Sequence, residues 1–310
     1  MLPAYSLIEG LLCGNVNILK LPEADEGITV MLLKMLSDME PAVKGYIHVF
    51  DTPSSDVAAM MKMAAMSDAI SVWGGDAAIG SVRQLASPGT ALIEWGHKLS
   101  FCYISGDFSG GFKDMESALL GLSENIISTK QLLCSSCQVI YLDTESMEDI
   151  YGFCEYFLPL LQKAAEGNAA RDIGERAETA LRQRVREIEA ILDENTDPSV
   201  KVFAFAACTL AACTDMELEL SDMFGNVLVK RLPRERMMDI LRKKKGYLQT
   251  AGLIAGKGRE ELAQALIRCG VNRVLFPGDM SVSFLRESHD GVFPFQRMTR
   301  VVNIEKAGNS

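Results

Sequence analysis

The sequence predicts an α/β protein of two domains, the first of them a nucleotide-type half-domain built on a parallel sheet. Short apolar runs alternate with helix-like segments through the first hundred residues, which is the pattern of βαβ units. These runs are continuously apolar, as parallel strands are when both faces of their sheet are covered. A chain of 310 residues also exceeds the size at which one core usually keeps growing, so a second domain is expected.

Apolar spacing and turn residues define the elements of the first half-domain. Gly14-Asn15 ends the first helix, and the polar run from Asp51 to Asp56 caps the third. We interpret the four methionines of that third helix as core filler. The predicted elements are a helix at 4–13, a strand at 16–21, a helix at 27–39, a strand at 46–50, a helix at 57–67, a strand at 69–73, a helix ending at 85 and a strand at 91–94.

The same alternation continues through the rest of the chain. The predicted elements are a strand at 98–105, a helix at 114–128, a strand at 138–143, helices at 147–167 and 171–194, a strand-like run at 202–212, a strand at 226–230, a helix at 234–245, a strand at 248–255, a helix at 260–269, a strand at 274–276 and an exposed strand at 298–304. We expect a nucleotide-binding domain at 1–97, a catalytic domain at 98–290, and a C-terminal strand or tail at 291–310 that contacts another subunit.

Composition excludes several classes of function. A net charge of −10 argues against nucleic-acid binding, which needs clustered basic side chains. No apolar run reaches the roughly 20 residues of a membrane span, and the first 14 residues lack the basic region of a signal peptide. Eight scattered cysteines fit a reducing compartment, so we expect a cytoplasmic protein.

A candidate nucleophile lies in the run Lys130 to Gln138. Cys134 and Cys137 stand there among small hydroxyl residues, between a helix-like segment and a strand-like one. Backbone N–H groups and partial exposure at such a turn favour a thiolate, so Cys134 is the candidate. The alternatives are that both cysteines are small buried hydrophobes or that they form a thioredoxin-like redox pair. No second CxxC or histidine pair accompanies them, so we expect no metal site.

Polar residues at the predicted strand ends mark the expected ligand edge of the first domain. They are Lys20, Asp51, Gly74-Gly75-Asp76 and Glu94. Gly74-Gly75 before a helix would let a pyrophosphate approach backbone amides, although a plain tight turn explains the pair equally well. Glu94 is a carboxylate that could serve a Cys134 thiol as a base or as a water-activating group.

Several segments together resemble one known family. They are residues 72–79 (VWGGDAAI), 93–101 (IEWGHKLSF), 134–136 with Gln138, 248–250 (LQT) and 289–291 (HDG). Over nearly the whole chain the sequence resembles the acyl-CoA reductases, the fatty-acid reductases of bacterial luminescence and their relatives, a branch of the aldehyde dehydrogenase superfamily. The resemblance implies an aldehyde dehydrogenase-like fold, in which a Rossmann-type nucleotide domain is followed by an α/β catalytic domain.

The resemblance also implies roles for single residues. Cys134 matches the catalytic thiol that attacks an acyl thioester, and Glu94 matches a general base or water-positioning glutamate. Lys20 matches a lysine that contacts the adenosine ribose, while Gly74 and Gly75 fall in the cofactor loop. Residues 222–227 resemble the E-x-F-G-P-V segment that holds the nicotinamide ribose, with Asp222 in place of Glu. The implied cofactor is NADPH or NADH, the implied substrate an acyl-CoA or acyl-protein thioester, and a homo-oligomer is expected.

Three departures from the family pattern affect this interpretation. His97 and Cys137 stand where relatives usually have proline. The superfamily also has an Asn-x-Pro segment before the first helix, whose Asn donates to the developing oxyanion, whereas this sequence begins Met1-Leu2-Pro3. The nucleotide domain is therefore expected to be incomplete. The leading hypothesis is an NAD(P)H-dependent acyl-CoA reductase. The alternatives are a truncated, catalytically weak homologue that binds nucleotide or a partner subunit, and a hydrolytic or thiol-transfer enzyme that uses the same cysteine.

Overall fold

The computed structural model divides the chain into two compact units. Residues 1–97 and 285–310 form the first unit, and residues 98–284 form the second. The structure describes residues 2–22, 25, 27–167, 174, 177, 181, 184, 185, 188, 200–205, 208–282 and 287–305. Within these ranges no helix is both long enough and apolar enough to cross a bilayer.

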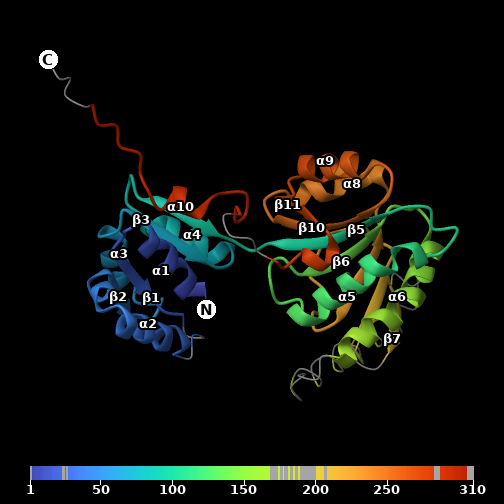
Figure 1. Ribbon diagram of the computed structural model, residues 1–310, viewed down its shortest axis with the longest axis horizontal. Helices are drawn as coiled ribbons and strands as arrows, with labels where there is room; N and C mark the ends of the chain where they lie inside the picture. The colour runs from blue at the N-terminus through green and yellow to red at the C-terminus, as the bar shows by residue number, and fades with distance from the viewer. Residues whose placement is uncertain are drawn as a thin grey trace. The chain divides into compact units, whose positions relative to one another are not determined.

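The first unit has the predicted alternation of strands and helices. Its elements are α1 (Leu2–Leu12), β1 (Asn17–Lys20), α2 (Ile28–Met39), β2 (Ile47–Phe50), α3 (Val57–Ala65), β3 (Ala69–Trp73), α4 (Asp76–Leu85), β4 (Ala91–Trp95) and, near the C-terminus, α10 (Pro294–Arg297) (Figure 1). The strands pair in parallel, β1 with β2 and β3 with β4. In the residues described here they form two separate pairs rather than the one sheet that the sequence suggested.

Helix α1 and an aromatic cluster hold the β3–β4 pair. Ser6 of α1 accepts a hydrogen bond from the Trp73 indole at 2.7 Å. The rings of Trp73 and Trp95 stack with their centroids 5.3 Å apart. The His289 ring meets both indoles edge-on, at 5.5 Å from Trp73 and 4.8 Å from Trp95. The segment around His289 therefore belongs to the first unit, whereas the sequence had suggested a catalytic domain that continued to residue 290.

The C-terminal segment differs from its prediction in a second way. Residues 298–304, expected as a strand, have no regular structure and follow the short helix α10. Polar contacts fix the start of this segment, because Asn15 donates to the Met298 carbonyl at 3.0 Å and Arg297 donates to the Leu92 carbonyl at 2.6 Å. The β-branched residues beyond them meet no strand within the described part of this one chain, and a strand forms only where a partner ladder exists.

The second unit is built on one seven-stranded sheet in the order β11-β10-β5-β6-β9-β8-β7. Its elements are β5 (Leu99–Ser105), α5 (Glu116–Thr129), β6 (Cys137–Leu142), α6 (Met147–Gly167), β7 (Val200–Phe205), β8 (Cys208–Cys213), β9 (Asn226–Arg231), α8 (Arg234–Leu241), β10 (Leu248–Ala255), α9 (Arg259–Cys269) and β11 (Arg273–Leu275). Short 3₁₀ turns lie at Pro41–Tyr46 in the first unit and at Lys113–Met115, Arg242–Lys244 and Pro277–Asp279 in the second.

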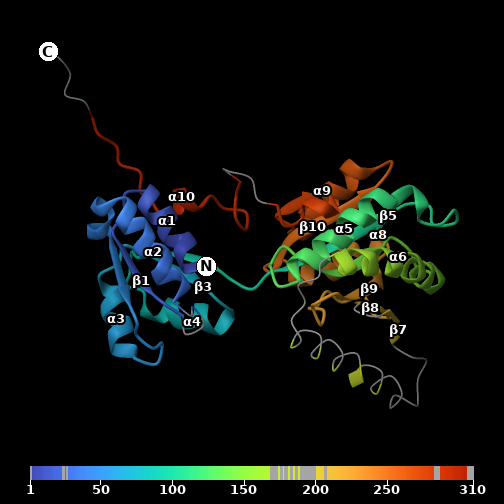
Figure 2. The same ribbon diagram turned by 60° about the horizontal axis from the view of Figure 1, so that its bottom comes forward.

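Helices cover both faces of this sheet. Helices α5 and α6 lie on one face and α8 and α9 on the other, as Figures 1 and 2 show. Accordingly the central strands β5 and β6 are buried along their whole length, and their alternate side chains enter two separate apolar clusters. The continuous apolar runs that predicted buried parallel strands are explained by this double cover.

Two other predictions for this unit have a different outcome. The apolar run 202–212, expected as one strand, forms the antiparallel pair β7 and β8. The sequence between them is Ala206-Ala207, which has none of the Gly, Asn or Asp residues that usually signal a hairpin. The predicted helix 171–194 lies almost entirely outside the described residues.

Asp143 ties the carboxyl ends of β5 and β6 to the start of α8. Its carboxylate accepts hydrogen bonds from Ser105 Oγ at 2.7 Å, from the Arg234 backbone N–H at 2.8 Å and from the Arg234 guanidinium at 2.8 Å. Burial alone would raise the pKa of this carboxyl, but the hydrogen bonds from Ser105 and Arg234 outweigh burial and lower the pKa. Asp143 is therefore ionised in the folded protein at neutral pH.

We predict that Asp143 contributes an acid-sensitive part of the stability. Because its pKa is lower in the folded state than the value of about 3.9 in an unfolded chain, its contribution is complete above that value and is lost as the pH falls through the folded-state pKa. Asp143→Asn should lower the free energy of unfolding at pH 7 by about 1–2 kcal/mol. Urea unfolding at pH 7 and pH 3 should show a smaller acid loss in the variant than in the parent. Equal losses in both proteins would contradict this role.

Candidate active site

Cys134 lies in the turn between α5 and β6. Helix α5 ends at Thr129, and the next two residues, Lys130 and Gln131, take left-handed backbone conformations, with φ of 52° and 59°. The chain then turns through Cys134 before β6 begins at Cys137. Cys134 is exposed, whereas Cys137 is fully buried and burial raises the pKa of its thiol to about 12. Of the two cysteines in this CxxC sequence, only Cys134 presents a thiol to solvent.

Side chains from two strands of the sheet, β10 and β5, form hydrogen bonds to Cys134. The Gln249 side chain of β10 donates from Nε2 to the Cys134 sulfur at 3.3 Å. Ser100 of β5 donates to the Cys134 carbonyl at 2.6 Å and accepts from the Thr250 backbone N–H at 3.1 Å. Gln249 and Ser100 are themselves buried, with exposed fractions of 3% and 0%. Buried polar side chains thus hold the exposed Cys134 thiol in place.

A buried network joins the Cys134 turn to the turn before β9. The Gln131 side chain donates to the Cys137 carbonyl at 2.9 Å and to Ser221 Oγ at 3.0 Å, and it accepts from the Gly225 N–H at 2.9 Å. Gln138 donates to the Gln131 carbonyl at 2.8 Å and accepts from Ser221 Oγ at 2.8 Å. Residues 222–227, which resemble a ribose-binding segment, are therefore bonded directly to the turn that carries Cys134.

We predict that Gln131 keeps this turn in place. Gln131→Leu should lower the free energy of unfolding by about 2–4 kcal/mol, because it removes three hydrogen bonds and leaves buried backbone groups unpaired. The strain of the positive φ at position 131 should be similar in both proteins, since Gln and Leu both carry a Cβ atom. Urea unfolding measures the loss, and Gln162→Leu on α6, which removes a hydrogen bond to Glu166 at 3.0 Å, is a control outside the network. A Gln131→Leu protein as stable as this control would show that the network does not hold the turn.

The structure places Glu94 in the first unit, paired with Arg83. The guanidinium of Arg83 on α4 donates two hydrogen bonds to the Glu94 carboxylate of β4, at 2.5 and 2.7 Å. Hydrogen bonding to Arg83 lowers the pKa of Glu94, and the charge of Arg297 acts in the same direction. A carboxylate held in this way is a weak base, because proton abstraction is most efficient when the pKa of the base lies near the working pH.

Lys20, Gly74 and Gly75 lie at strand ends of the first unit. Lys20 ends β1, and its ammonium donates to Ser54 Oγ at 2.8 Å. Gly75 precedes α4, and a Cβ added there would meet no atom within 4 Å, so a ligand could approach the start of the helix. Gly74 is needed for packing instead, since an added Cβ would lie 2.9 Å from the Ala78 Cβ. An ammonium and an open helix start are compatible with the ribose and pyrophosphate of a dinucleotide.

The candidate residues thus fall into two groups. Cys134 belongs to the second unit, together with Gln249, Ser100 and the 222–227 turn, whereas Glu94, Lys20, Gly74 and Gly75 belong to the first. Neither Gln249 nor Gln131 is among the site residues predicted from the sequence. A signal for Gln249 is present in the sequence, because Gln249-Thr250 is a polar pair inside an otherwise apolar strand, and a buried polar side chain is informative.

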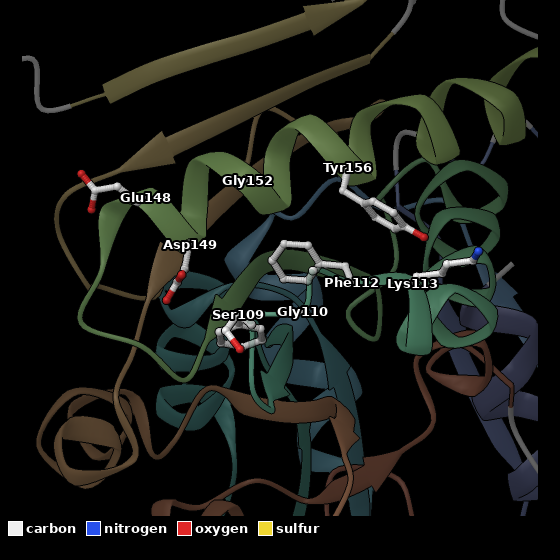
Figure 3. Close-up of a pocket in the computed structure, with 10 residues that line it drawn as sticks. Ser109, Gly110, Phe112, Lys113, Glu148, Asp149, Gly152 and Tyr156 are labelled. Carbon is white, nitrogen blue, oxygen red and sulfur yellow. The ribbon is translucent and has the colours of Figure 1, made fainter.

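A pocket of about 400 Å³ lies at the other end of the second unit's sheet. Figure 3 shows Phe112 and the neighbouring loop residues facing Glu148, Asp149 and Gly152 of α6. This loop follows β5 and α6 follows β6, so the pocket adjoins the carboxyl ends of these strands. Cys134 precedes β6 and contacts Ser100 near the start of β5. The pocket is therefore not the surface around the thiol.

Comparison with known proteins decides the family. The family model described as "Acyl-CoA reductase (LuxC)" matches residues 1–301. The chain belongs to this family. Its relatives include proteins named long-chain acyl-protein thioester reductase, one from Photorhabdus laumondii that is 24% identical over 97% of this chain and one from Aliivibrio fischeri that is 20% identical over 98% of it. The chain spans about 60% of the length of these relatives.

Solved structures confirm an aldehyde dehydrogenase-like α/β fold. The methylmalonate-semialdehyde dehydrogenase of Oceanimonas doudoroffii superimposes with a TM-score of 0.66 at 15% identity, covering 93% of this chain and 63% of that one. A Sinorhizobium meliloti 1021 protein, assigned as a methylmalonate-semialdehyde dehydrogenase and complexed with NAD, gives a TM-score of 0.65 at 15% identity over 100% of this chain and 68% of its own. At these identities the likeness establishes the fold alone. The family resemblance read from the sequence motifs is confirmed.

Proposed function

We propose that this chain reduces a long-chain acyl thioester, carried on coenzyme A or on a protein, to an aldehyde through an acyl group held on Cys134. The observation that carries the proposal is the exposed Cys134 thiol, which accepts a hydrogen bond from Gln249 in a member of the acyl-CoA reductase family. The names of its relatives support an acyl thioester as the substrate.

The chemistry of Cys134 follows from its position. Its thiolate attacks the acyl carbonyl carbon, a new S–C bond forms, and the bond to the leaving thiol breaks. The leaving thiolate takes a proton from solvent, and the acyl group stays on Cys134 as a thioester. When bound, a reduced nicotinamide cofactor would supply a hydride to the carbonyl carbon of this acyl group. Cleavage of the S–C bond would then release the aldehyde and return the Cys134 thiolate.

Residues of the first unit are proposed to hold the cofactor, NADPH or NADH. Lys20 would face the adenosine ribose, and Gly75 would let the pyrophosphate approach the start of α4, with Gly74 shaping the loop. The NAD-bound structural relative supports a nicotinamide cofactor. The 222–227 turn is proposed to meet the nicotinamide ribose, since it is bonded to the Cys134 turn through Gln131.

Glu94 suits reduction better than hydrolysis. We assign it the role of an ionised, water-positioning carboxylate rather than that of a general base, because the hydrogen bonds from Arg83 lower its pKa. Weak activation of water would spare the acyl group on Cys134 from hydrolysis to a free acid.

The same proposal places the protein in the cytoplasm as a homo-oligomer. The apolar side chains of Val301 and Ile304, which are 93% and 84% exposed, are candidates for a subunit contact.

One assay separates this function from its alternatives. The protein is incubated with a long-chain acyl-CoA and NADPH or NADH, and fatty aldehyde, free fatty acid and cofactor oxidation are measured together. We expect aldehyde in equal amount to the oxidised cofactor. Free acid without cofactor oxidation would instead indicate a hydrolytic or thiol-transfer enzyme. Binding of NADPH or NADH without either product would indicate a homologue that binds nucleotide without turnover.

A further inference from the structure

Two β-bulges flank Ser100, near the start of the central strand β5. On β10, Leu248 pairs with Leu99 and Ala251 with Phe101, so Gln249 and Thr250 both stand opposite Ser100. On β6, Cys137 pairs with Ser100 and Val139 with Phe101, which leaves Gln138 as an extra residue. Bulges of this kind redirect a side chain and are over-represented next to active sites.

The bulge in β10 changes the direction of the Gln249 side chain. Leu248 and Ala251 are three residues apart but pack in the same apolar cluster, whereas regular alternation would put them on opposite faces. On the β5 side neither Gln249 nor Thr250 has a regular partner, whereas on the other side Thr250 pairs in register with Arg273 of β11. Thr250 donates its N–H to Ser100, and the Gln249 amide reaches the Cys134 sulfur at 3.3 Å.

The contact between Gln249 and Cys134 joins a donor held in place by packing to the sulfur of an exposed residue. Gln249 is 3% exposed, so packing restricts its rotamers. Its Nε2 atom carries only N–H donors, and a donor favours the charged form of the group that accepts from it. Ser100 holds the backbone of Cys134, because the Ser100 hydroxyl donates to the Cys134 carbonyl. The sulfur and the backbone of Cys134 are therefore held by two side chains that lie at one level of the sheet.

We propose that Gln249 is a positioning residue for Cys134, whose amide N–H fixes the direction of the sulfur and stabilises the thiolate. The inference rests on the proposed role of Cys134 as the nucleophile. It also explains the bulge in β10, because a regular strand would not bring the Gln249 amide and the Cys134 sulfur together. Gln249 acts through Cys134 and is not assigned a contact with the substrate.

The test measures the reactivity of the thiol without turnover. The rate of Cys134 alkylation by iodoacetamide is followed by peptide mass spectrometry from pH 6 to pH 10 in the parent protein, in Gln249→Leu and in Gln249→Glu. We expect labelling at pH 7 to fall about tenfold in Gln249→Leu, and at least as far in Gln249→Glu, which puts an anion beside the sulfur. Near pH 10, where a free thiol with a reference pKa of about 8.5 is already ionised, the rates should converge.

A matched control uses Asn272, which lies beside the same bulge. Its side chain donates to the Leu248 carbonyl at 3.1 Å, whereas the donor to the Cys134 sulfur is Gln249, so Asn272→Ala should keep the parent profile. Thermal unfolding of each variant checks that the fold is intact. A Gln249→Leu profile that overlies the parent profile would overturn the proposal, and so would an equal slowing at every pH, which indicates altered access alone. A shifted profile in a protein that forms no aldehyde would leave this inference standing while the proposed function fails.

Discussion

Cys134→Ala is expected to lower aldehyde formation by a factor of about a thousand or more, because it removes the atom that carries the acyl group. The substitution should leave the fold intact, since Cys134 is exposed and its side chain fills no core. The measurement is turnover of a long-chain acyl-CoA with NADPH or NADH, followed as fatty aldehyde. Thermal unfolding shows that the variant remains folded.

The control for this prediction is Cys137→Ala, three residues further along the chain, where β6 begins. Cys137 is fully buried, and its raised pKa keeps its thiol neutral. Its side chain packs in the apolar cluster with α5 and α6, so the variant should lose some stability but keep turnover of the same order. If Cys137→Ala lost as much activity as Cys134→Ala, the two cysteines would act as a redox pair and the assignment of a single nucleophile would be wrong.

The largest expected loss of stability comes from Asp215→Asn combined with Glu219→Gln. Both carboxylates accept hydrogen bonds from Lys230 Nζ at 2.6 Å, and the Lys230 side chain is fully buried. Burial alone would lower the pKa of Lys230, but the bonds to Asp215 and Glu219 outweigh burial and raise the pKa. The double variant removes both negative charges, so the buried ammonium faces neutral acceptors, among them the Glu217 carbonyl at 2.9 Å. The free energy of unfolding should fall by about 3–5 kcal/mol.

Lys230→Met is the matched comparison and should cost less. The Asp215 and Glu219 side chains are 51% and 55% exposed, so without Lys230 they regain water, while methionine refills most of the buried space. We expect a loss of less than about 2 kcal/mol. Urea unfolding of the three proteins measures the order. A double variant that is no less stable than Lys230→Met would contradict the view that the buried cation is the sensitive partner.

This ion cluster also bears on the active site. Lys230 holds the segment from Asp215 to Glu219, which leads into Ser221 and the turn bonded to Gln131. Loss of the cluster should therefore disturb the Cys134 turn as well as the stability. Slower alkylation of Cys134 in the double variant than in Lys230→Met is the expected sign of this connection.

The fold could be predicted from the sequence where local signals and tertiary packing agree. The buried strands β5, β6 and β10 are mainly apolar runs, and Gly14 and Gly270 lie with positive φ just after the helices that they end. The apolar pattern of the sequence is insufficient where the pairing of strands decides the structure. The β-branched run 298–304 has strand propensity but forms no strand within the described chain, and the hairpin of β7 and β8 has no turn signal.

The site was predicted only in part, for a related reason. Cys134 could be chosen because small hydroxyl residues and a helix end surround it in the sequence. Its contact with Gln249 joins positions 115 residues apart and depends on a bulge, which shifts the register of a strand by one residue. Likewise the Arg83–Glu94 pair joins a helix to a strand. No spacing rule for a single helix or strand contains either contact, so three-dimensional information was needed to find them.

The central claim is that Cys134 carries the acyl group, and covalent labelling tests it most directly. The protein is mixed with a long-chain acyl-CoA in the absence of NADPH and NADH, digested, and examined by peptide mass spectrometry. We predict that the peptide containing Cys134 gains the mass of one acyl group, and that hydroxylamine, which cleaves thioesters, removes it. An acyl group found on another residue, or one that still forms in Cys134→Ala, would contradict the account.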